Sequence, residues 1–308
     1  MIFPITDLWD DASSSQWIAQ YFHPHGFRCP YCESGVEHAR VCRHSKRGLV
    51  DYRGKPCARV YNLYSGTVFA GCGLSARQAV LLLRGVGKGE RRATLAEELG
   101  GCRSTGHLLG QKVQANGYPM LAEGAWPDTD TETDEMCQKA GKKGQRHADP
   151  AAPPRRHANQ RRGQGTSEND GPPVVGTGGR QTGGWRLRVR AHRDGVRLRA
   201  QVQGYTQRQA RCYTEEWQGY TRSKRWQGTV CQGAKEWARD DDGDGLREVH
   251  TNTIEGVWTA VGNFLRPFRG VHKKYLTYYL AMGEHRINRK RICPAFIAGL
   301  VTAHKIQT

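Results

Sequence analysis

Hydrophobic residues in the first part of the chain recur mainly at helical spacing. The stretch from Trp17 to Phe22 predicts a short amphipathic helix. The same spacing predicts two helices from residue 75 to Gly100-Gly101 and a third at about 104–116. This third helix should carry its polar side chains outward: His107, Gln111, Lys112 and Gln114. Three short helices with a tight glycine turn before the last are typical of a helix-turn-helix, and a plain helical hairpin between two domains fits equally well.

Beyond residue 130 the pattern changes to short β-prone runs with helical runs among them. The run at 185–192 alternates Trp, Leu, Val and Ala with Arg and His, as a half-buried strand does. The other predicted strands are 132–136, 172–176 and 209–213, and the predicted helices are 198–208, 253–265 and 275–285. Strands that alternate with helices predict an α/β or α+β sheet.

The most informative stretch is Val-His-Thr-Asn-Thr-Ile-Glu-Gly-Val-Trp at 249–258. A β-prone piece ends at Val249, a polar turn follows, and apolar residues then return at helical spacing: Ile254, Val257, Trp258, Val261 and Leu265. Glu255 therefore lies on the first turn of a helix, just after a Thr or Asn cap. A carboxylate there either interacts with the helix dipole or points into a cleft from a rigid element. Trp258 is expected in the core, behind Glu255.

The charge balance points to a polyanionic partner. The 308 residues include 47 Lys and Arg against 29 Asp and Glu, a formal net charge of +18. A surplus of this size attracts nucleic acid above all. Part of it lies at 139–171, a basic tract rich in Gly and Pro with almost no apolar residues, which predicts a long mobile insertion. The charges of this tract suit phosphate contacts, and the candidates within it are Arg155, Arg156, Arg161 and Arg162.

The chain shows no sign of a membrane span or of export. No run of 18 apolar residues occurs, and the N-terminus lacks the basic region and apolar stretch of a signal peptide. We therefore expect a cytoplasmic protein that associates with the nucleoid when it binds DNA. In that compartment the ten cysteines are expected to be metal ligands or buried thiols rather than disulfides.

A zinc site is predicted near the N-terminus. The Cys-Pro-Tyr-Cys knuckle at 29–32 aims two thiolates at one tetrahedral ion, and a second pair is needed to close the site. Cys57 is in place for that pair, but Gly54 stands where the other cysteine is expected. Cys42 and His44 are candidates for the fourth ligand. The spacing thus predicts Zn²⁺ at three cysteines, with loss of the zinc or incidental thiols as alternatives: Cys29, Cys32 and Cys57.

Three carboxylates stand at the ends of predicted strands or helices: Asp134, Glu215 and Glu255. Phosphodiester chemistry requires that the attacking and the leaving oxygen both be stabilised, which two Mg²⁺ ions can do. Hard cations prefer carboxylate oxygens, and carboxylates from three separate elements can hold such a pair. A basic surface would hold the polyanion over them.

The acidic run Asp-Asp-Asp-Gly-Asp-Gly at 240–245 superficially resembles an EF-hand calcium loop. Thr251 stands at its twelfth position, where such a loop has a bidentate Glu. We interpret the run as an acidic surface turn, with calcium binding as the alternative.

Four ordered blocks resemble those of bacterial insertion-sequence transposases of the DDE type. The blocks are Thr-Asp-Glu-Met at 133–136, Pro-Pro-Val-Val-Gly at 172–176, Tyr-Thr-Glu-Glu-Trp-Gln-Gly-Tyr at 213–220 and His-Thr-Asn-Thr-Ile-Glu-Gly-Val-Trp at 250–258. The similarity continues through 263–271 and 273–276, and it covers most of the chain from about Cys29 to about Val301. The ordered set is specific, whereas no single block is.

The resemblance implies an α/β fold: a ribonuclease H-like mixed sheet with flanking helices, preceded by a small zinc-ribbon-like module and a helix-turn-helix. It implies an N-terminal helix and zinc-ribbon-like module at 1–70, a helix-turn-helix DNA-binding region at 71–118, and a catalytic domain at 119–308 that contains the basic insertion. Asp134, Glu215 and Glu255 would be the metal carboxylates. The implied activity is Mg²⁺- or Mn²⁺-dependent cleavage of transposon ends, followed by transfer of the freed 3′-hydroxyl to target DNA.

The implied partners are DNA and further copies of the chain assembled on it. The zinc ribbon and the helix-turn-helix would recognise the terminal inverted repeats, and the catalytic domain would also engage the target DNA. Besides the four arginines of the basic insertion, the side chains expected to contact DNA are Lys112, Asn252, Arg266, Arg269, Lys273 and Lys274.

The chain departs from the family pattern at three positions. Glu215 stands where the family has Asp, and the extra methylene displaces the carboxylate by about 1 Å, enough to cost roughly a hundredfold in rate. Gly262 stands where the family has Lys or Arg to contact DNA, and Gly54 removes a zinc ligand. Together these departures favour a weakened or decayed copy. The alternative is a catalytically inactive DNA-binding protein that retains the transposase fold.

Overall fold

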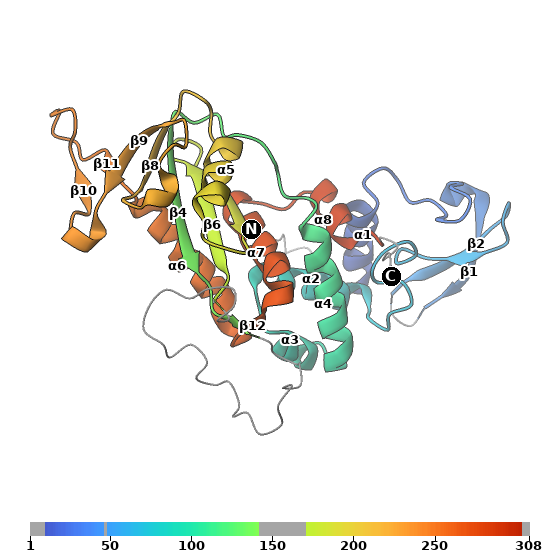
Figure 1. The fold of residues 1–308 in the computed structure, drawn as a ribbon. Coiled ribbons are helices and arrows are strands. Elements are labelled where there is room, and N and C mark those ends of the chain that lie inside the picture. The colour runs from blue at the N-terminus through green and yellow to red at the C-terminus, as the bar shows by residue number, and fades with distance from the viewer. Residues whose placement is uncertain (1–9, 46–47, 142–170, 304–308) are drawn as a thin grey trace, which may run out of the picture. The chain divides into compact units, whose positions relative to one another are not determined.

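The computed structural model describes residues 10–45, 48–141 and 171–303, and the chain divides into two compact units. Unit 1 comprises Met1–Met120 and Arg289–Thr308, and unit 2 comprises Leu121–Asn288. Across both units the described residues form eight α-helices and several sheets, so the predicted mixed α/β class is confirmed (Figure 1). Most of the predicted basic insertion, from residue 142 to residue 170, lies outside the described residues.

The described residues of unit 1 form five α-helices and a small antiparallel sheet. The helices are α1 (Asp11–Phe22), α2 (Ala76–Lys88), α3 (Arg92–Glu98), α4 (Arg103–Gly117) and α8 (Pro294–Val301). The strands pair in the order β1 (Ala39–His44), β2 (Val50–Gly54) and β3 (Val60–Tyr61). Helix α1 packs against α2 and α8, and α4 packs against α3 and α8. The helices at 75–100 and at 104–116 are thus found where their apolar spacing predicts them. Helix α1 contains the predicted helix at 17–22 but begins earlier, at Asp11, because the Asp10 side chain caps it by accepting the Ser13 amide.

The C-terminal helix belongs to unit 1, whereas the resemblance placed it in the catalytic domain. Helix α8 buries an apolar face formed by Phe296, Ile297 and Leu300. The Asn116 side chain, buried on α4, donates hydrogen bonds to the carbonyl oxygens of Leu300 and Thr302 at 2.8 and 2.7 Å. These contacts join segments more than 180 residues apart, which local sequence patterns do not reveal.

Helix α4 turns inward one polar side chain that the sequence pattern placed outside. Gln114 is only 1% exposed, whereas His107 is exposed and Lys112 is half-buried. The reason is the helical spacing, because all the buried residues of α4 except Asn116 recur at intervals of three and four: Gly106, Leu109, Gly110, Val113, Gln114 and Gly117. The prediction for Gln114 was therefore wrong.

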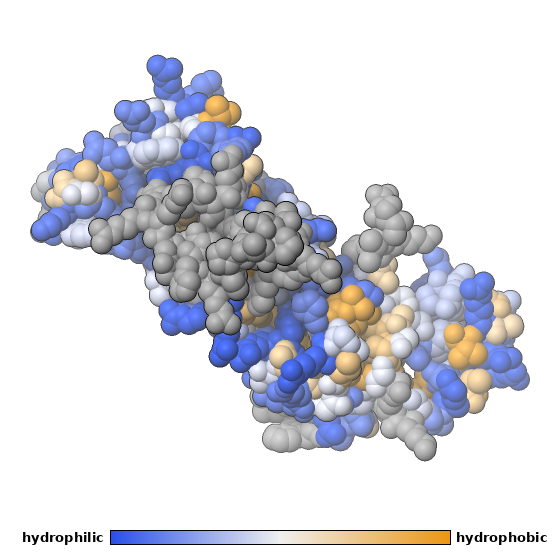
Figure 2. Space-filling model, turned by 60° about the horizontal axis from the view of Figure 1, so that its bottom comes forward, coloured by the Kyte–Doolittle hydropathy of each residue, from blue (hydrophilic) through white to orange (hydrophobic). Residues whose placement is uncertain are grey.

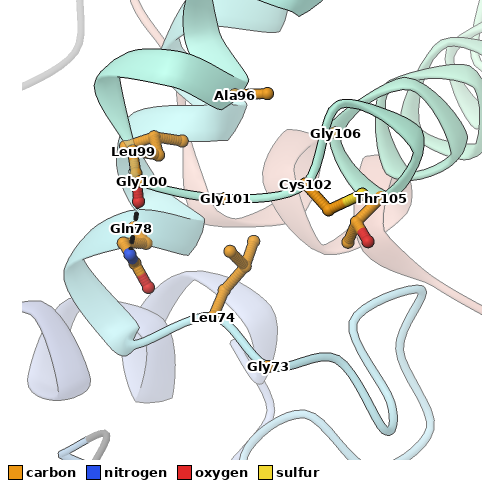
Figure 3. Close-up of a pocket in the computed structure, with 10 residues that line it drawn as sticks. All are labelled: Gly73, Leu74, Gln78, Ala96, Leu99, Gly100, Gly101, Cys102, Thr105 and Gly106. Atoms are coloured by element: carbon orange, nitrogen blue, oxygen red, sulfur yellow. Dashed lines mark hydrogen bonds between the residues drawn. The ribbon is translucent and has the colours of Figure 1, made fainter.

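A small pocket lies where α2, α3 and α4 meet, and Figure 3 shows the residues that line it. Gln78 on α2 forms a capping box with Ser75, in which each side chain bonds the backbone of the other residue. The Gln78 amide also donates to the carbonyl oxygen of Leu99 at 2.6 Å. One side chain thus caps the start of α2 and fixes the end of α3, which stabilises the three-helix arrangement.

Unit 2 is built on a five-stranded mixed sheet. Its strands lie in the order β7 (Trp185–Val189), β6 (Pro173–Gly179), β4 (Asp130–Cys137), β8 (Arg211–Glu215) and β9 (Trp226–Val230). Strand β6 runs antiparallel to both β7 and β4, while β8 and β9 run parallel to β4. Three helices accompany the sheet: α5 (Gly195–Tyr205), α6 (Asn252–Leu265) and α7 (Lys273–Asn288).

The described residues of unit 2 also form two shorter strand pairings and three 3₁₀ turns. The pairings join β10 (Ala238–Arg239) to β11 (Val249–His250) and β5 (Ala140–Gly141) to β12 (Val271–His272). The 3₁₀ turns are η3 (Gln218–Tyr220), η4 (Gln232–Ala234) and η5 (Arg266–Phe268). Unit 1 contains a comparable turn, η1 (Val36–His38).

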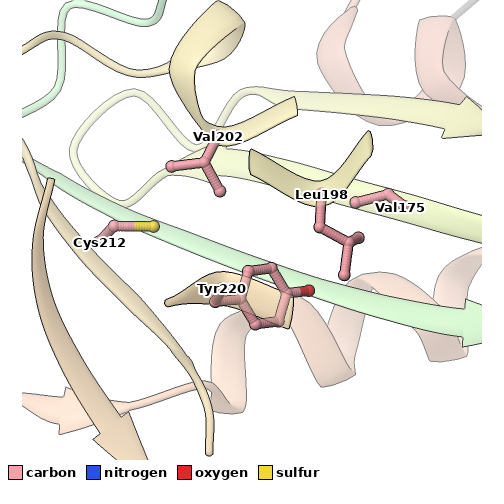
Figure 4. Packing of buried hydrophobic residues seen from close by; sticks show 5 residues of the cluster. All are labelled: Val175, Leu198, Val202, Cys212 and Tyr220. Carbon is pink, nitrogen blue, oxygen red and sulfur yellow. The ribbon is translucent and has the colours of Figure 1, made fainter. Parts of the chain in front are cut away.

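Helices α5 and α6 cover opposite faces of the sheet. On the α5 face a buried cluster joins the helix to β6, β8 and η3, and its members, drawn in Figure 4, are Val175, Leu198, Val202, Cys212 and Tyr220. On the other face Gly176 contacts α6, because neighbouring strand residues point to opposite sides. A Cβ atom on Gly176 would lie 2.8 Å from the Trp258 ring, so this glycine allows α6 to approach the sheet closely.

The surface is predominantly hydrophilic on the face drawn in Figure 2, where hydrophobic residues form small separate patches. The large exposed hydrophobic side chains of unit 2 are Val196, Trp226, Trp237 and Leu246. Within the described ranges, no helix combines the length and apolar character that crossing a bilayer requires.

Candidate functional site

The parallel pairing of β4 and β8 places Asp134 and Glu215 beside each other. The register pairs Glu132 with Tyr213, so Asp134 and Glu215 follow two residues further along each strand. Because strand side chains alternate between faces, both carboxylates project from the face that α6 covers. Asp134 is 8% exposed, and Glu215, the last residue of β8, is half-buried.

Helix α6 brings the third predicted carboxylate to the same face. Ile254 is fully buried against the sheet, which fixes the first turn of the helix. Trp258 donates a hydrogen bond from Nε1 to Oδ2 of Asp134 at 2.7 Å. Glu255 lies three residues before Trp258, so both project from the same side of α6. The structure therefore brings the three predicted carboxylates, Asp134, Glu215 and Glu255, to one region, and we refer to them as the trio. Glu255 is exposed and Asp134 is buried.

Burial and mutual repulsion raise the pKa values of two members of the trio, Asp134 and Glu215. Burial raises the pKa of Asp134 to about 7, and the charges of Glu135 and Glu215 act in the same direction, while the hydrogen bond from Trp258 opposes them. Burial also raises the pKa of Glu215, as does the charge of Glu255, while Arg193 lowers it. A bound cation would relieve this repulsion.

The oxygen-only donor set suits Mg²⁺ or Mn²⁺. In the described part of the chain, the oxygens of these three carboxylates do not all lie within 4.8 Å of one another, so they do not form one compact ligand group. A spread arrangement is compatible with a pair of ions, because two-metal sites separate their ions by about 3.5–4 Å.

We expect Trp258→Phe to weaken Mn²⁺ binding about tenfold at about pH 7, because a hydrogen bond to a charged group contributes roughly 1.5–3 kcal/mol. Phenylalanine keeps an aromatic ring against Gly176 but cannot donate to Asp134. The lost bond favoured the ionised carboxylate, so its removal raises the pKa of Asp134 further. Calorimetric titration with Mn²⁺ should show the deficit narrowing at about pH 8.5, where a larger fraction of the variant's carboxylate is ionised than at about pH 7. An equal deficit at both pH values would contradict this role.

Sequence patterns missed three residues that act on these carboxylates, two through hydrogen bonds and one through its charge. Trp258 was expected in the core, yet it is half-buried and bonded to Asp134. Gln232, just after β9, donates from Nε2 to Oε1 of Glu255 at 2.5 Å. Arg193 lies over the Trp217 ring at 4.5 Å, forms an ion pair with Glu135 and lowers the pKa of Glu215. Of these three residues, only Arg193 could have been suspected from the sequence, because it lies in an arginine-rich run at the end of a predicted strand.

The predicted cysteine ligands converge in unit 1. The sulfur atoms of Cys29, Cys32 and Cys57 all lie within 4.8 Å of one another. The Cys32 thiol has its pKa lowered to about 7, chiefly by hydrogen bonds from Ser34 and also by its cysteine neighbours. In the described residues this group includes neither Cys42 nor His44, the two candidates for the fourth ligand. Three clustered thiols, one of which ionises easily, suit Zn²⁺.

Gly54 lies beside this group, at the end of β2. A Cβ atom built on Gly54 would be 3.0 Å from Sγ of Cys57. Its φ is not among the positive values found at eleven other glycines, so the backbone accepts a residue with a side chain. The position therefore faces the cysteine group, but glycine supplies no ligand there.

The acidic run at 240–245 also gathers possible ligand atoms. Oxygens of Asp240, Asp242 and Asp244 lie within 4.8 Å of one another, and all three residues are partly or fully exposed. Each carboxylate accepts hydrogen bonds from backbone amides of the same loop, as in an acidic surface turn.

The residues expected to contact DNA differ in their surroundings. Lys112 on α4 and Lys273 on α7 are half-buried, and Lys274 is exposed with its Nζ 5.9 Å from the centre of the Tyr275 ring. The exposed members on or near α6 are Asn252, Arg266 and Arg269. Four more lie outside the described residues: Arg155, Arg156, Arg161 and Arg162.

Comparison with known proteins finds a similar sequence in a transposable element. No family model matches the sequence. The chain is 26% identical over 283 residues to a Halobacterium salinarum protein described as an "Uncharacterized protein in transposable element ISH50", and the match covers 91% of each chain. The chain is thus distantly similar, along nearly its whole length, to a protein of an insertion-sequence element.

Proposed function

We propose that the chain is a DDE-type transposase, which binds transposon ends and catalyses metal-dependent cleavage and transfer of DNA strands. The observation that carries the proposal is that Asp134, Glu215 and Glu255 lie on one face of the sheet. They come from two adjacent strands and a helix, and more than 100 residues of sequence separate the first from the last. The near full-length similarity to a transposable-element protein supports the same assignment.

The architecture of unit 2 supports a ribonuclease H-like catalytic domain. Three antiparallel strands, extended by two strands parallel to the central one, give the mixed sheet that the resemblance implies. Asp134 lies on the central strand and Glu215 at the end of its parallel neighbour. Both positions are those expected for carboxylates that share divalent cations.

The roles of the chain's own groups follow from charge and position. Asp134, Glu215 and Glu255 would hold the cations, which when bound stabilise the attacking and leaving oxygens of a phosphodiester. Gln232 orients the Glu255 carboxylate through its hydrogen bond, and Arg193 offsets part of the negative charge at Glu215. The net charge of +18 favours DNA as the partner, with α4 and the basic side chains as contacts.

In unit 1, Cys29, Cys32 and Cys57 would hold a zinc ion that stabilises the small sheet, and α2 to α4 would bind the terminal repeats. Chain-to-chain assembly on paired ends belongs to the same proposal. Static light scattering of the protein with and without end DNA measures the assembly directly.

A second function is favoured by one specific residue. Glu215 in place of Asp moves the carboxylate by about 1 Å, which can cost roughly a hundredfold in rate. A chain with this defect would bind transposon ends without cutting them. Binding and cleavage of a labelled duplex that carries the element's own ends, in Mg²⁺ and in Mn²⁺, separate the two functions, because only the transposase produces nicks.

We expect Glu215→Asp to raise the nicking rate roughly ten- to a hundredfold. The shorter side chain draws the carboxylate back toward β8, beside Asp134. Glu216→Asp is the matched control, because Glu216 is exposed and lies one position beyond the end of the strand. A wild-type protein that already cuts fast and gains nothing from Glu215→Asp would show that the longer side chain is no defect.

A further inference from the structure

The carboxylate of Glu132 is fully buried, yet it belongs to neither set of predicted ligands. It lies on β4, two residues before Asp134 and on the same face of the sheet. Its Oε1 accepts hydrogen bonds from Nε of Arg180 and Oγ1 of Thr253, both at 2.8 Å. Its Oε2 accepts the backbone amide of Ile254 at 2.9 Å. These three donors satisfy the hydrogen-bonding capacity that a buried carboxylate needs.

Two of the donors to Glu132, Thr253 and Ile254, lie in the first turn of α6. The residue before the helix, Thr251, makes no side-chain capping bond, so the first amides of α6 have no local acceptor there. Glu132 accepts the Ile254 amide instead, from a different element of the fold. A negative charge at a helix N-terminus is also favoured by the helix dipole. The cap of α6 is therefore supplied by β4.

Arg180 holds the segment that leads into α6. Its Nη1 donates to the carbonyl oxygen of Glu248 at 2.7 Å, and its Nη2 donates to that of His250 at 2.6 Å. The guanidinium also lies over the Tyr213 ring, 3.8 Å from its centre. Through Arg180 and Glu132, the chain on both sides of Thr251 is tied to the sheet.

We propose that Glu132 is a positioning residue that fixes Glu255 relative to Asp134. One side of its network is the strand that carries Asp134, and the other is the amide of Ile254, immediately before Glu255. Among the buried carboxylates of the described residues, Glu132 is the one on β4 that bonds the backbone of α6, whereas Asp134 accepts only the Trp258 side chain. The inference rests on the proposed function for its consequence, which is cation binding by the trio, while the anchoring of α6 is tested independently.

The test compares Glu132→Gln with Glu284→Gln in the full-length protein. Glu284 is buried in the same unit and accepts the Leu187 amide and Nη1 of Arg188, both at 2.7 Å, but it ties α7 to β7. Both variants therefore lose one buried charge paired with an arginine and a backbone amide. A glutamine at 132 has a single acceptor oxygen, and its amino group would face a donor.

The first readout is hydrogen exchange followed by mass spectrometry. Glu132→Gln should speed exchange at least tenfold in peptides that cover 252–258, and Glu284→Gln should leave those peptides unchanged. Thr253→Val removes only one of the three donors and should give a smaller change of the same sign, which keeps the test decisive if Glu132→Gln does not fold. Unchanged exchange at the start of α6 in both Glu132→Gln and Thr253→Val would overturn the inference.

The second readout is Mn²⁺ affinity by calorimetry. Loss of a residue that orients metal ligands typically weakens binding about 10- to 100-fold, so we expect this for Glu132→Gln and less than about twofold for Glu284→Gln. Equal weakening in both variants would indicate a general loss of stability and would contradict positioning. If wild type binds no Mn²⁺, the proposed function fails, and the exchange readout still decides whether Glu132 anchors α6.

Discussion

Asp134→Asn is expected to lower divalent-cation-dependent nicking about a thousandfold, because a metal ligand at this chemistry contributes several kcal/mol to the transition state. The residue is buried on the central strand and bonded to Trp258, so asparagine fits the same space and keeps an acceptor for that bond. The assay is cleavage of an end-bearing duplex in Mn²⁺, performed in wild type and also in the Glu215→Asp background, where the signal is larger. Asp130→Asn, on the same strand but paired with Arg211, serves as the control and should cut normally.

The same substitution should change how stability depends on pH when cations are removed. The pKa of Asp134 is about 7 in the folded chain against an ordinary 3.8, so between these values the folded state holds a proton that the unfolded state has released. Stability should therefore fall as the pH rises from about 4 to about 7, and Asp134→Asn should remove this contribution. Urea unfolding in a chelator at several pH values measures it. A wild type whose stability rises through that range, with no difference from the variant, would show that Asp134 is not buried as described.

Gly54→Cys is expected to raise Zn²⁺ affinity on the order of a hundredfold or more, because structural zinc sites are four-coordinate and thiolate ligands contribute strongly. The new thiol would extend from a Cβ position 3.0 Å from Sγ of Cys57 and complete the group with Cys29 and Cys32. Competition with a chromophoric chelator gives the affinity, and the thermal midpoint of the zinc-loaded protein should rise with it.

Two variants control for this result. Gly54→Ala adds the same Cβ without a thiol and should leave the affinity at the wild-type value or slightly below it, because the contact with Cys57 is tight. Cys42→Ser removes an exposed thiol outside the group and should change nothing. If Gly54→Cys bound zinc no more tightly than Gly54→Ala, the group would not be a zinc ribbon that lacks one ligand.

Local pattern was sufficient for most elements of this fold. The spacing of Leu82, Leu83 and Val86 predicted α2, and that of Ile254, Val257 and Val261 predicted α6, because an apolar stripe at helical period must face a core. The alternation at 185–189 likewise predicted β7. Gln114 was misplaced because its polar type was given more weight than its position on the buried stripe of α4.

The tertiary arrangement of the elements could not be predicted from local sequence patterns. No local signal tied α8 to unit 1, since Asn116 reaches Leu300 across most of the chain. The order of the strands in the sheet likewise depends on long-range pairing, because β4 bonds β6 and β8 rather than its sequence neighbour β5.

The candidate carboxylates could be named from the sequence, but their supporting contacts could not. The trio was found from position and from family resemblance, whereas the hydrogen bonds from Trp258 and Gln232 and the charge effect of Arg193 exist only in the folded arrangement. Glu132 did carry a usable signal. In the run Glu-Thr-Asp-Glu at 132–135, the period of two places Glu132 with Asp134 on one face and Glu135 on the other.

The position of bound Mn²⁺ tests the central claim most directly. Crystals of the full-length protein grown with Mn²⁺ should show anomalous scattering peaks between the carboxylates of Asp134, Glu215 and Glu255, and these peaks should be lost in Asp134→Asn. Peaks confined to the acidic loop at Asp240, Asp242 and Asp244, with the trio free of metal, would contradict the account.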